Sequence, residues 1–286
     1  MGKIVIVGSG PAGCSAALYA ARAGQEVVVI SMGMGALSKA ELIQNYYGFE
    51  EGITGAELYR QGVAGAKAVG AEFITAEVVG LDYTGSLVVQ TTEGDYPADA
   101  VILATGTGRI APKIAGLAEH EGRGVSYCAT CDAFFYRGKT AAVLGSGEYA
   151  LHEVQALLPL AGRVILCTNG EPLTADFPEG VEICTEKLAA VEGEEKVSAL
   201  RLENGELLPV EGLFVALGVA GSAALARKLG APVENGRIVV DEKMQTGIPG
   251  LYAAGDCTGG LLQVCKAVYE GALAATEAIK QIRGKK

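Results

Sequence analysis

The chain has 286 residues, half of them hydrophobic, which is enough for roughly two domains with substantial cores. Its net charge of -10 disfavours nucleic acid and anionic membrane surfaces as partners, and no apolar run reaches the roughly 18 residues of a membrane helix. The seven cysteines are an odd number and no secretory leader is recognisable, so we expect a cytoplasmic protein rather than a disulfide scaffold.

The first 30 residues predict a βαβ unit. The apolar run 3–8 is typical of a buried parallel strand, the Ala-rich stretch 14–24 indicates a helix, and 26–30 is a second apolar run. The turn between the first strand and the helix is "GSGPAG", at 8–13. A strand, a glycine-rich turn and a helix in this order are typical of a dinucleotide-binding fold.

The glycine spacing in this turn predicts a pyrophosphate site. Gly8 permits the tight turn, Gly10 lets the backbone approach a pyrophosphate, and Gly13 lets helix and strand pack closely. The free N–H groups at the start of the helix also attract phosphate. The second strand ends at Ser31 instead of the acid that would contact a ribose, so this contact stays unassigned.

The rest of the chain predicts more elements of the same kinds, and one segment repeats the strand, glycine turn, helix and strand of the N-terminus. In chain order we predict a helix at 57–73, strands within 72–105 with a hairpin at Gly85, a buried strand at 98–106, a second βαβ unit at 140–167, strands within 182–218, a strand at 247–256 and a helix at 261–282.

The second glycine turn lacks a residue that would recognise a nucleotide. "GSGEYA", at 145–150, is a GxGxxA variant, but the strand after its helix ends in Cys167, Thr168 and Asn169. NAD requires an acid at such a position, and a 2′-phosphate requires a cation. We therefore favour a degenerate pyridine-nucleotide-type fold, with a working nicotinamide cofactor site as the alternative.

Cys128 and Cys131 stand three residues apart in "CATCDAF". Zinc would need two further Cys or His ligands at a matching spacing, which the sequence does not offer, so we expect no metal. A C-x-x-C motif near a βαβ pattern favours a redox dithiol over two buried bystanders. A helical turn here would stabilise a thiolate, and Asp132 could shuttle a proton. For the aromatic run 134–136 we favour anchoring in the core over a surface for a flavin or partner.

The order of these motifs resembles that of the low-molecular-weight thioredoxin reductases. The resemblance rests on GxGxxG at 8–13, "ILATG" at 102–106, "CATCD" at 128–132, GxGxxA at 145–150 and "GLYAAGD" at 250–256. It implies an α/β fold of two Rossmann-like, three-layer ββα domains, the second inserted in the first. It further implies a homodimer, an FAD-binding domain formed by 1–113 and 242–286, and a redox-dithiol domain at 114–241.

The resemblance also implies an activity and its residues. The chain would be a thioredoxin-disulfide reductase that uses FAD and a Cys128–Cys131 redox disulfide, with Asp132 as the acid. The implied FAD-binding residues come from five segments of the chain: Gly8, Gly10, Pro11, Ala12, Gly13, Asn45, Ala104, Thr105, Gly106, Gly255, Asp256, Gln263 and Val264.

Departures from the family pattern bear on the electron donor. NADPH-dependent members carry a His-Arg-Arg run and a further Arg after the strand that here ends "LCTNG", and an Arg where this chain has Leu262. The tail at 255–275 is similar to that of ferredoxin-dependent flavin thioredoxin reductases, which implies ferredoxin as the donor. An NAD(P)H-dependent reductase and a flavin-dependent thiol oxidase stay open as alternatives.

The energetics are consistent with ferredoxin. Plant-type ferredoxins lie near about −400 mV and thioredoxin near about −270 mV, so two electrons release ~6 kcal/mol. A flavin can hold the first electron until the second arrives. Because ferredoxins are usually acidic, as this chain is, docking would need a local basic patch, for which the candidates are Lys39, Lys113, Lys243 and Lys266.

Overall fold

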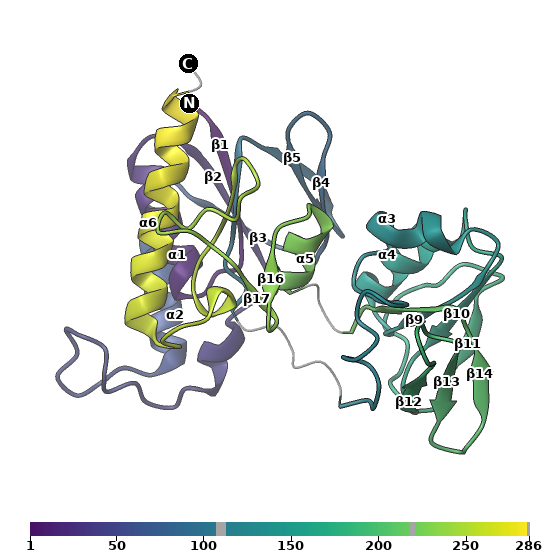
Figure 1. Cartoon of the computed structure of the whole chain (residues 1–286). Coiled ribbons are helices and arrows are strands. Elements are labelled where there is room, and N and C mark those ends of the chain that lie inside the picture. Colours follow the sequence, from purple (N-terminus) through teal and green to yellow (C-terminus); the bar gives the residue numbers. More distant parts are fainter. Residues whose placement is uncertain (107–112, 218–220, 285–286) are drawn as a thin grey trace. The chain divides into compact units, whose positions relative to one another are not determined.

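The computed structural model describes residues 1–106, 113–217 and 221–284, without the side chains of Thr130 and Cys131. The chain divides into two compact units, residues 1–108 with 221–286 and residues 109–220. The second unit is thus inserted in the first (Figure 1), and the predicted α/β fold of two Rossmann-like domains is confirmed. Among the helices of the described ranges, none has the length and apolar character needed to cross a membrane.

The first unit is built on a parallel sheet of strand order β18-β7-β1-β2-β3. Its central strands are apolar and buried along nearly their whole length, as expected for a parallel sheet covered on both faces. The strands of this unit are β1 (Lys3–Val7), β2 (Glu26–Ser31), β3 (Glu72–Thr75), β4 (Val78–Tyr83), β5 (Leu87–Thr91), β6 (Gly94–Ala98), β7 (Ala100–Leu103), β16 (Val233–Glu234), β17 (Arg237–Ile238) and β18 (Leu251–Ala253).

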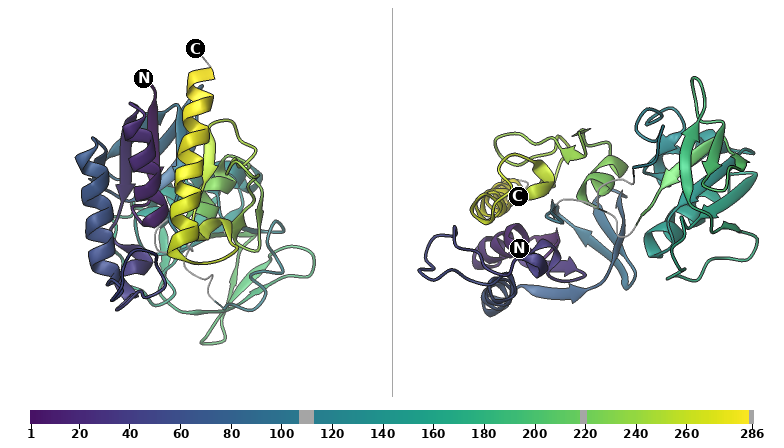
Figure 2. Two further views of the ribbon diagram at one scale, coloured as in Figure 1. Left: turned by 90° about the vertical axis from the view of Figure 1, so that its left-hand side faces the viewer. Right: turned by 90° about the horizontal axis from the view of Figure 1, so that it is seen from below.

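Helices form one outer layer of the first unit, and the antiparallel sheet β4-β5-β6 forms the other. Three long helices lie side by side over one face of the parallel sheet (Figure 2). The helical segments are α1 (Pro11–Arg22), η1 (Gly35–Lys39), α2 (Gly55–Ala68), α5 (Ser222–Lys228), η3 (Asp256–Thr258) and α6 (Val264–Gly284). The unit therefore has the three layers that the resemblance implies.

Helices α1 and α6 pack unusually closely because a glycine lies at their contact. A Cβ atom built on Gly271 of α6 would lie 2.0 Å from the carbonyl oxygen of Ala12 in α1. Only a residue without a side chain fits there. This contact fixes the start of α1, which follows the glycine turn, against the helix that ends the chain.

The second unit repeats the plan on a smaller scale. Its parallel sheet has the order β11-β10-β9-β15-β8, and an antiparallel sheet β12-β13-β14 accompanies it. Its elements are β8 (Val125–Ser126), α3 (Ala129–Asp132), η2 (Ala133–Tyr136), β9 (Thr140–Leu144), α4 (Glu148–Leu157), β10 (Arg163–Cys167), β11 (Glu182–Cys184), β12 (Leu188–Glu192), β13 (Ala199–Leu202), β14 (Leu207–Pro209) and β15 (Gly212–Val215).

The boundaries of the units differ from the expected ones at 113 and 241. Residues 221–241, which include α5, β16 and β17, belong to the first unit. The physical reason is a local network in which the Thr105 and Ser222 hydroxyl oxygens lie 2.7 Å apart and the Ser222 N–H donates to Thr105 Oγ1 at 2.9 Å. The helix expected at 57–73 also ends earlier, at Ala68, and residues from Glu72 form β3.

The glycine contact between α1 and α6 predicts a loss of stability for Gly271→Ala. The added methyl group overpacks the helix contact, for which we expect a cost of about 1–3 kcal/mol in unfolding free energy. Gly65 is a matched control, because it lies within α2 and a Cβ there meets no atom within 4 Å. Gly65→Ala should stabilise the protein by about 0.5–1 kcal/mol. Urea unfolding of the FAD-loaded variants measures both, and equal midpoints would contradict the close packing.

Candidate active site

The glycine turn of the first unit has two glycines that the chain itself requires and one that leaves open space. A Cβ on Gly8, whose φ is +109°, would lie 2.3 Å from the Ala104 carbonyl oxygen, and one on Gly13 would lie 1.8 Å from the Gly8 carbonyl oxygen. A Cβ on Gly10 would meet no protein atom within 4 Å. The backbone at Gly10 is therefore accessible to a ligand at the start of α1, as a pyrophosphate site requires.

Hydroxyl groups, not a carboxylate, lie beside this turn. The Ser31 hydroxyl at the end of β2 donates to Ser9 Oγ at 2.7 Å, and Ser9 Oγ lies 3.1 Å from the Tyr59 hydroxyl oxygen. Ser31 therefore reaches back to the glycine turn. This network occupies the region where the sequence offered no acid for a ribose.

A second part of the site follows β18, where Gly255 and Asp256 precede η3. The Gly255 N–H donates to Glu270 Oε2 at 2.8 Å, and Lys266 Nζ donates to the Gly255 carbonyl oxygen at 2.8 Å. Lys266 and Glu270 also form an ion pair at 2.9 Å, and both side chains are largely buried. Lys266 is thus used inside the first unit, which removes it from the expected docking patch.

The Asp256 carboxylate has the character of a ligand group. It is partly buried, and no hydrogen bond or ion pair reaches it from the residues that the structure describes. Burial raises the pKa of Asp256, while the positive charges of Lys266 and Arg237 oppose this rise. A partly buried carboxylate without a protein donor can accept a hydrogen bond from a ligand hydroxyl.

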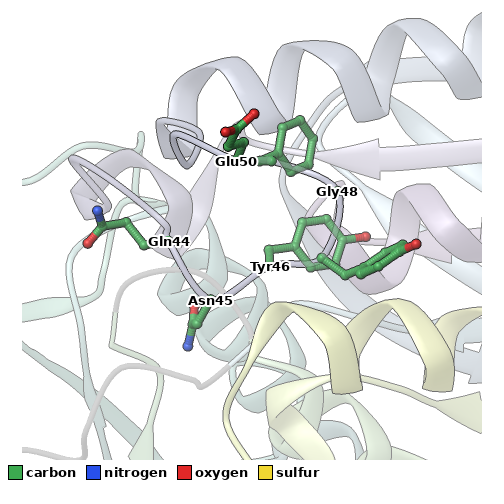
Figure 3. Close-up of a pocket in the computed structure, with 7 residues that line it drawn as sticks. Gln44, Asn45, Tyr46, Gly48 and Glu50 are labelled. Atoms are coloured by element: carbon green, nitrogen blue, oxygen red, sulfur yellow. The ribbon is translucent and has the colours of Figure 1, made fainter.

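The loop 44–50 brings two more predicted residues together. Asn45 Nδ2 donates to Gln263 Oε1 at 2.9 Å, and Val264 packs against the small apolar cluster that anchors this loop. The loop surrounds a hollow of about 570 Å³, and Asn45 lies on the side of the loop that faces the chain before α6 (Figure 3). Two segments 218 residues apart thus meet at one amide pair.

These observations fit FAD in the first unit. The turn at Gly10, after the central strand β1, leaves room for the pyrophosphate, and Asp256, after the edge strand β18, offers a free acceptor. Pro11 and Ala12 open α1, Ala104 and Thr105 follow β7, and Gly106 has a φ of +73° beyond them. The expected FAD residues therefore all lie in the first unit. They lie after β1, β7 and β18, in the loop 44–50, and at the start of α6.

The dithiol segment lies in the second unit. Cys128 is 4% exposed and is disulfide-bonded, and Cys131 lies in α3, with a side chain outside the described residues. The Ser126 hydroxyl donates to Asp132 Oδ2 at 2.7 Å, and the Cys128 N–H donates to Ser126 Oγ at 3.1 Å. The expected helical turn is confirmed, and Ser126 holds the Asp132 carboxylate close to the backbone of Cys128.

Glu153 is a residue of this site that the sequence reasoning missed. It is fully buried on α4, and its Oε2 accepts a hydrogen bond of 2.5 Å from the N–H of Ala129, the first residue of α3. The signal was present in the sequence, because Glu153 shares the buried face of α4 with Tyr149, Ala150, Val154 and Leu157. A carboxylate on such a face requires a partner, and here that partner is the turn that carries the cysteines.

The aromatic residues after the dithiol do not anchor the core as expected. The side chains of Phe134 and Phe135 are 66% and 67% exposed, and only Tyr136 of this run packs inward, with its ring 5.1 Å from that of Phe214. The Arg137 guanidinium lies over the Phe134 ring at 5.4 Å. The dithiol is therefore followed by an exposed apolar surface with a positive charge beside it.

The second glycine turn, in contrast to the first, has a loop residue in contact with it, while Ser146 and Gly147 stay half-exposed. The Thr174 N–H donates to the Ser146 carbonyl oxygen at 2.8 Å, and a Cβ on Gly147 would lie 3.0 Å from Thr174 Oγ1. Gly145 is needed by the chain itself, since a Cβ there would lie 2.2 Å from the Ala216 carbonyl oxygen. The nucleotide-binding architecture is thus retained, with a loop residue lying on its turn.

An open pyrophosphate turn in one unit and a disulfide-bonded turn in an inserted unit define the class of the protein, a two-domain flavin disulfide reductase. A family model described as pyridine nucleotide-disulphide oxidoreductase matches residues 2–271. Thioredoxin reductases of Aquifex aeolicus and Listeria innocua are 35% and 33% identical, over 99% and 98% of this chain and 94% and 93% of theirs.

Solved structures show the same relationship. The atypical thioredoxin reductase TRi from Desulfovibrio vulgaris Hildenborough is 40% identical with a TM-score of 0.93, over 99% of both chains. A ferredoxin-flavin thioredoxin reductase from Clostridium acetobutylicum is 35% identical with a TM-score of 0.75, over 99% of this chain and 98% of the other. The chain therefore belongs to the thioredoxin reductases of the pyridine nucleotide-disulphide oxidoreductase family, FAD flavoproteins that reduce the disulfide of thioredoxin.

The open space at Gly10 predicts a binding defect without a folding defect for Gly10→Ala. The methyl group meets no protein atom, so the thermal midpoint of the flavin-free protein should stay unchanged. The affinity for FAD should fall at least about tenfold, or ~1.4 kcal/mol, because the backbone can no longer approach the pyrophosphate. Flavin fluorescence titration measures the affinity, with Gly65→Ala as a control of the same size. Normal FAD binding by Gly10→Ala would place the pyrophosphate elsewhere.

The buried contact of Glu153 predicts different results for two substitutions. Glu153→Leu leaves the Ala129 N–H buried without an acceptor, for which we expect a loss of about 1–3 kcal/mol in stability. Glu153→Gln keeps an oxygen acceptor for this N–H and should therefore lose less stability. Hydrogen exchange of the peptide that contains Ala129 should accelerate in the Leu variant and stay near the parent rate in the Gln variant. Equal exchange in both variants would show that Glu153 does not hold this turn.

Proposed function

We propose that this thioredoxin reductase takes its electrons from ferredoxin and not from a pyridine nucleotide. The observation that carries this proposal is the second glycine turn, where Thr174 contacts Ser146 and lies close to Gly147. A dinucleotide needs the backbone of that turn for its pyrophosphate. A nicotinamide cofactor at this turn would meet the Thr174 side chain beside the Gly147 backbone.

The end of β10 adds to this argument. Asn169 Oδ1 accepts a hydrogen bond from the Leu188 N–H at 2.8 Å, and the Arg163 guanidinium donates to both carboxylate oxygens of Glu182 at 2.6–3.0 Å. Both side chains are therefore committed to the fold. Lys187 lies nearby with its stem against Gly170, but a single ammonium lacks the bidentate hydrogen bonds that arginines give a 2′-phosphate.

The comparisons support the same donor. One of the similar structures is that of a ferredoxin-flavin thioredoxin reductase, and the similarity extends over nearly the whole length of both chains. Leu262, which stands where NADPH-dependent members carry an arginine, is 41% exposed. Since Lys266 is engaged with Glu270, a basic docking patch for ferredoxin would draw on Lys39, Lys113 or Lys243.

We assign the FAD contacts to the residues of the first unit that leave space or free polar groups. Gly8, Gly10 and Gly13 shape a turn that would hold the pyrophosphate, and the Asp256 carboxylate would accept a hydrogen bond from a hydroxyl of the cofactor. The amide pair of Asn45 and Gln263, with Val264 after it, would contact the polar edge of the flavin ring. When bound, FAD accepts electrons singly and supplies them in pairs.

The dithiol carries the reduction to thioredoxin. Two electrons and two protons open the disulfide of Cys128 and Cys131, and Asp132, held by Ser126, gives up or takes a proton at its carboxylate oxygens. One thiolate then attacks the thioredoxin disulfide, and the second thiol resolves the mixed disulfide. The exposed rings of Phe134 and Phe135 offer thioredoxin an apolar contact directly beside the cysteines.

The donor is tested by measuring which reductant supports reduction of thioredoxin by the FAD-loaded protein without oxygen. Reduced ferredoxin should bleach the flavin and sustain the formation of thioredoxin thiols. NADPH should be at least about 100-fold slower, because two or more charge-assisted hydrogen bonds of ~1.5–3 kcal/mol each are missing. Stopped-flow absorbance of the flavin separates the two reductants, and fast bleaching by NADPH would reject the proposal.

The control for this experiment is Cys128→Ser. In this variant, ferredoxin should still bleach the flavin, while thioredoxin thiols no longer form because the disulfide is lost. A variant that still reduces thioredoxin would contradict the role of Cys128. Peroxide formation from added dithiols and oxygen, at a rate above that of thioredoxin reduction, would favour the thiol oxidase alternative instead.

A further inference from the structure

Two cysteines outside the active-site motif face each other in the second unit. Cys167 is the last residue of β10, Cys184 is the last residue of β11, and the two are direct partners in the parallel ladder. Neighbouring strands lie about 4.8 Å apart, and partners in register point to the same face of the sheet. This spacing falls within the Cα separations of disulfides, about 4.4–6.8 Å. Both thiols are free in the structure.

The two thiols have opposite surroundings. Cys167 is fully buried in the core of the second unit, and Cys184 packs against the same cluster while part of its surface stays exposed. The Cys167 thiol and the Glu186 N–H donate hydrogen bonds to the Cys184 sulfur, and they lower the pKa of Cys184 to about 6 against the effects of burial and of the Glu182 and Glu186 carboxylates.

Cys167 responds in the opposite direction. The hydrogen bond to Cys184 is the largest cause that raises the pKa of Cys167, and burial and the negative charge of Cys184 raise it further. At neutral pH the pair is thus an accessible thiolate beside a protected thiol. This division resembles the arrangement in which one sulfur attacks an oxidant and the other resolves the product.

The pair also lies next to the loop that contacts the second glycine turn. The Gly145 N–H donates to the Cys167 carbonyl oxygen at 3.0 Å, and the Thr168 N–H donates to the Cys184 carbonyl oxygen at 2.9 Å. Residues 168–181 leave the sheet after Cys167 and return to it at Glu182, the start of β11, and Thr174 within them contacts the turn. A bond between the two sulfurs would close this loop covalently.

We propose that Cys167 and Cys184 form a second redox-active thiol pair, which hydrogen peroxide converts to a disulfide. The Cys184 thiolate attacks one peroxide oxygen, and the O–O bond breaks. Cys184 becomes a sulfenic acid, and hydroxide is released. The Cys167 thiol gives its proton to this hydroxide and attacks the Cys184 sulfur, which forms the S–S bond and expels a second hydroxide. This hydroxide takes the proton lost when Cys184 first ionised, so two waters form. The thiols lose two electrons and the peroxide gains two.

The surroundings of Cys167 favour the second step once the first has occurred. The thiolate charge on Cys184 is one of the causes that raise the Cys167 pKa, and a sulfenic acid no longer carries this charge. The resolving thiol therefore becomes easier to ionise when its partner has been oxidised. The disulfide then ties β11, a strand of three residues at the edge of the sheet, to β10.

The test uses the FAD-loaded protein with the active-site disulfide intact. After treatment with hydrogen peroxide, free thiols are blocked with N-ethylmaleimide and the protein is digested with trypsin. Residues 164–187 hold both cysteines and no Lys or Arg before Lys187, so they form one peptide. We expect this peptide to lose the mass of two hydrogen atoms, to take up no maleimide, and to recover both thiols in dithiothreitol. A protease that cuts after Glu should give fragments that stay linked until reduction.

The pH dependence of the reaction gives a second measurement. With a Cys184 pKa of about 6, the thiolate fraction rises from about one tenth at pH 5 to about nine tenths at pH 7. The rate of disulfide formation should therefore increase up to about tenfold across this range and change little above it. The groups that set this profile are Cys167, Glu182 and Glu186, and no change in rate between pH 5 and 7 would overturn the proposal.

Three variants separate the pair from other thiols. Cys167→Ala should raise the Cys184 pKa, slow the reaction, and stop it at a sulfenic acid that dimedone traps. Cys167→Ser keeps a donor of similar size, so it should stop at the same stage with a faster first step. Cys265→Ser removes an exposed cysteine outside the pair and should leave the linked peptide unchanged. The proposal fails if the parent peptide takes up two maleimides after peroxide, or if its Cys184 also stops at a sulfenic acid.

Discussion

The structure depends on how closely a strand, a turn and a helix approach each other at the carboxyl edge of a parallel sheet. In the first unit, Gly13 brings α1 so near the Gly8 carbonyl that no side chain fits, and this approach aims the start of the helix over the sheet edge. Open space lies beside the backbone of Gly10, directly before the helix. In the second unit, Gly145 allows a similarly close approach of the chain, but Thr174 contacts the turn. One backbone geometry thus leaves open space beside the turn of one unit and a loop residue in contact with the turn of the other.

Buried carboxylates place the functional turns in both units. Glu270 on α6 accepts the Gly255 N–H that precedes η3, and Glu153 on α4 accepts the Ala129 N–H that begins α3. A buried carboxylate is costly unless it is hydrogen-bonded, so each one holds its turn in a defined position. The first is neutralised by Lys266, whereas the second shares its carboxylate with His152 at 3.2 Å. The acceptors of both turns therefore come from rigid helices and not from the loops themselves.

The sequence was most informative where a function depends on local spacing. The glycines of both turns, the C-x-x-C motif and the alternation of strands and helices all specify short-range geometry, and they predicted the fold. The loop that carries Asn45 and the segment before α6 came from the family resemblance, and the structure adds the amide hydrogen bond that joins them. No spacing rule predicts such a contact across 218 residues.

Long-range polar contacts explain what the sequence did not predict. The expected boundary at 241 overlooked the hydrogen bonds between Thr105 and Ser222, which join residues 117 positions apart and keep α5 in the first unit. Glu153 was overlooked because its partner is a backbone N–H 24 residues away, and a backbone group leaves no mark in a sequence. The prediction that Phe134 and Phe135 anchor the core was wrong for a different reason. Apolar composition favours burial, but a partner surface also requires apolar residues.

The same physical terms divide the cysteines into reactive and inert ones. Burial raises the pKa of Cys14 to about 12 and that of Cys257 to about 11, so at neutral pH these thiols stay protonated and unreactive. Cys184 lies in a surrounding of acidic side chains and still has a lowered pKa, because its neighbour donates a hydrogen bond to the thiolate. Pairing between strands therefore outweighs the local negative charge. A hydrogen bond from Ser222 also favours the thiolate of Cys257, but burial outweighs it there. The balance between burial and hydrogen bonding therefore sets the pKa of each thiol.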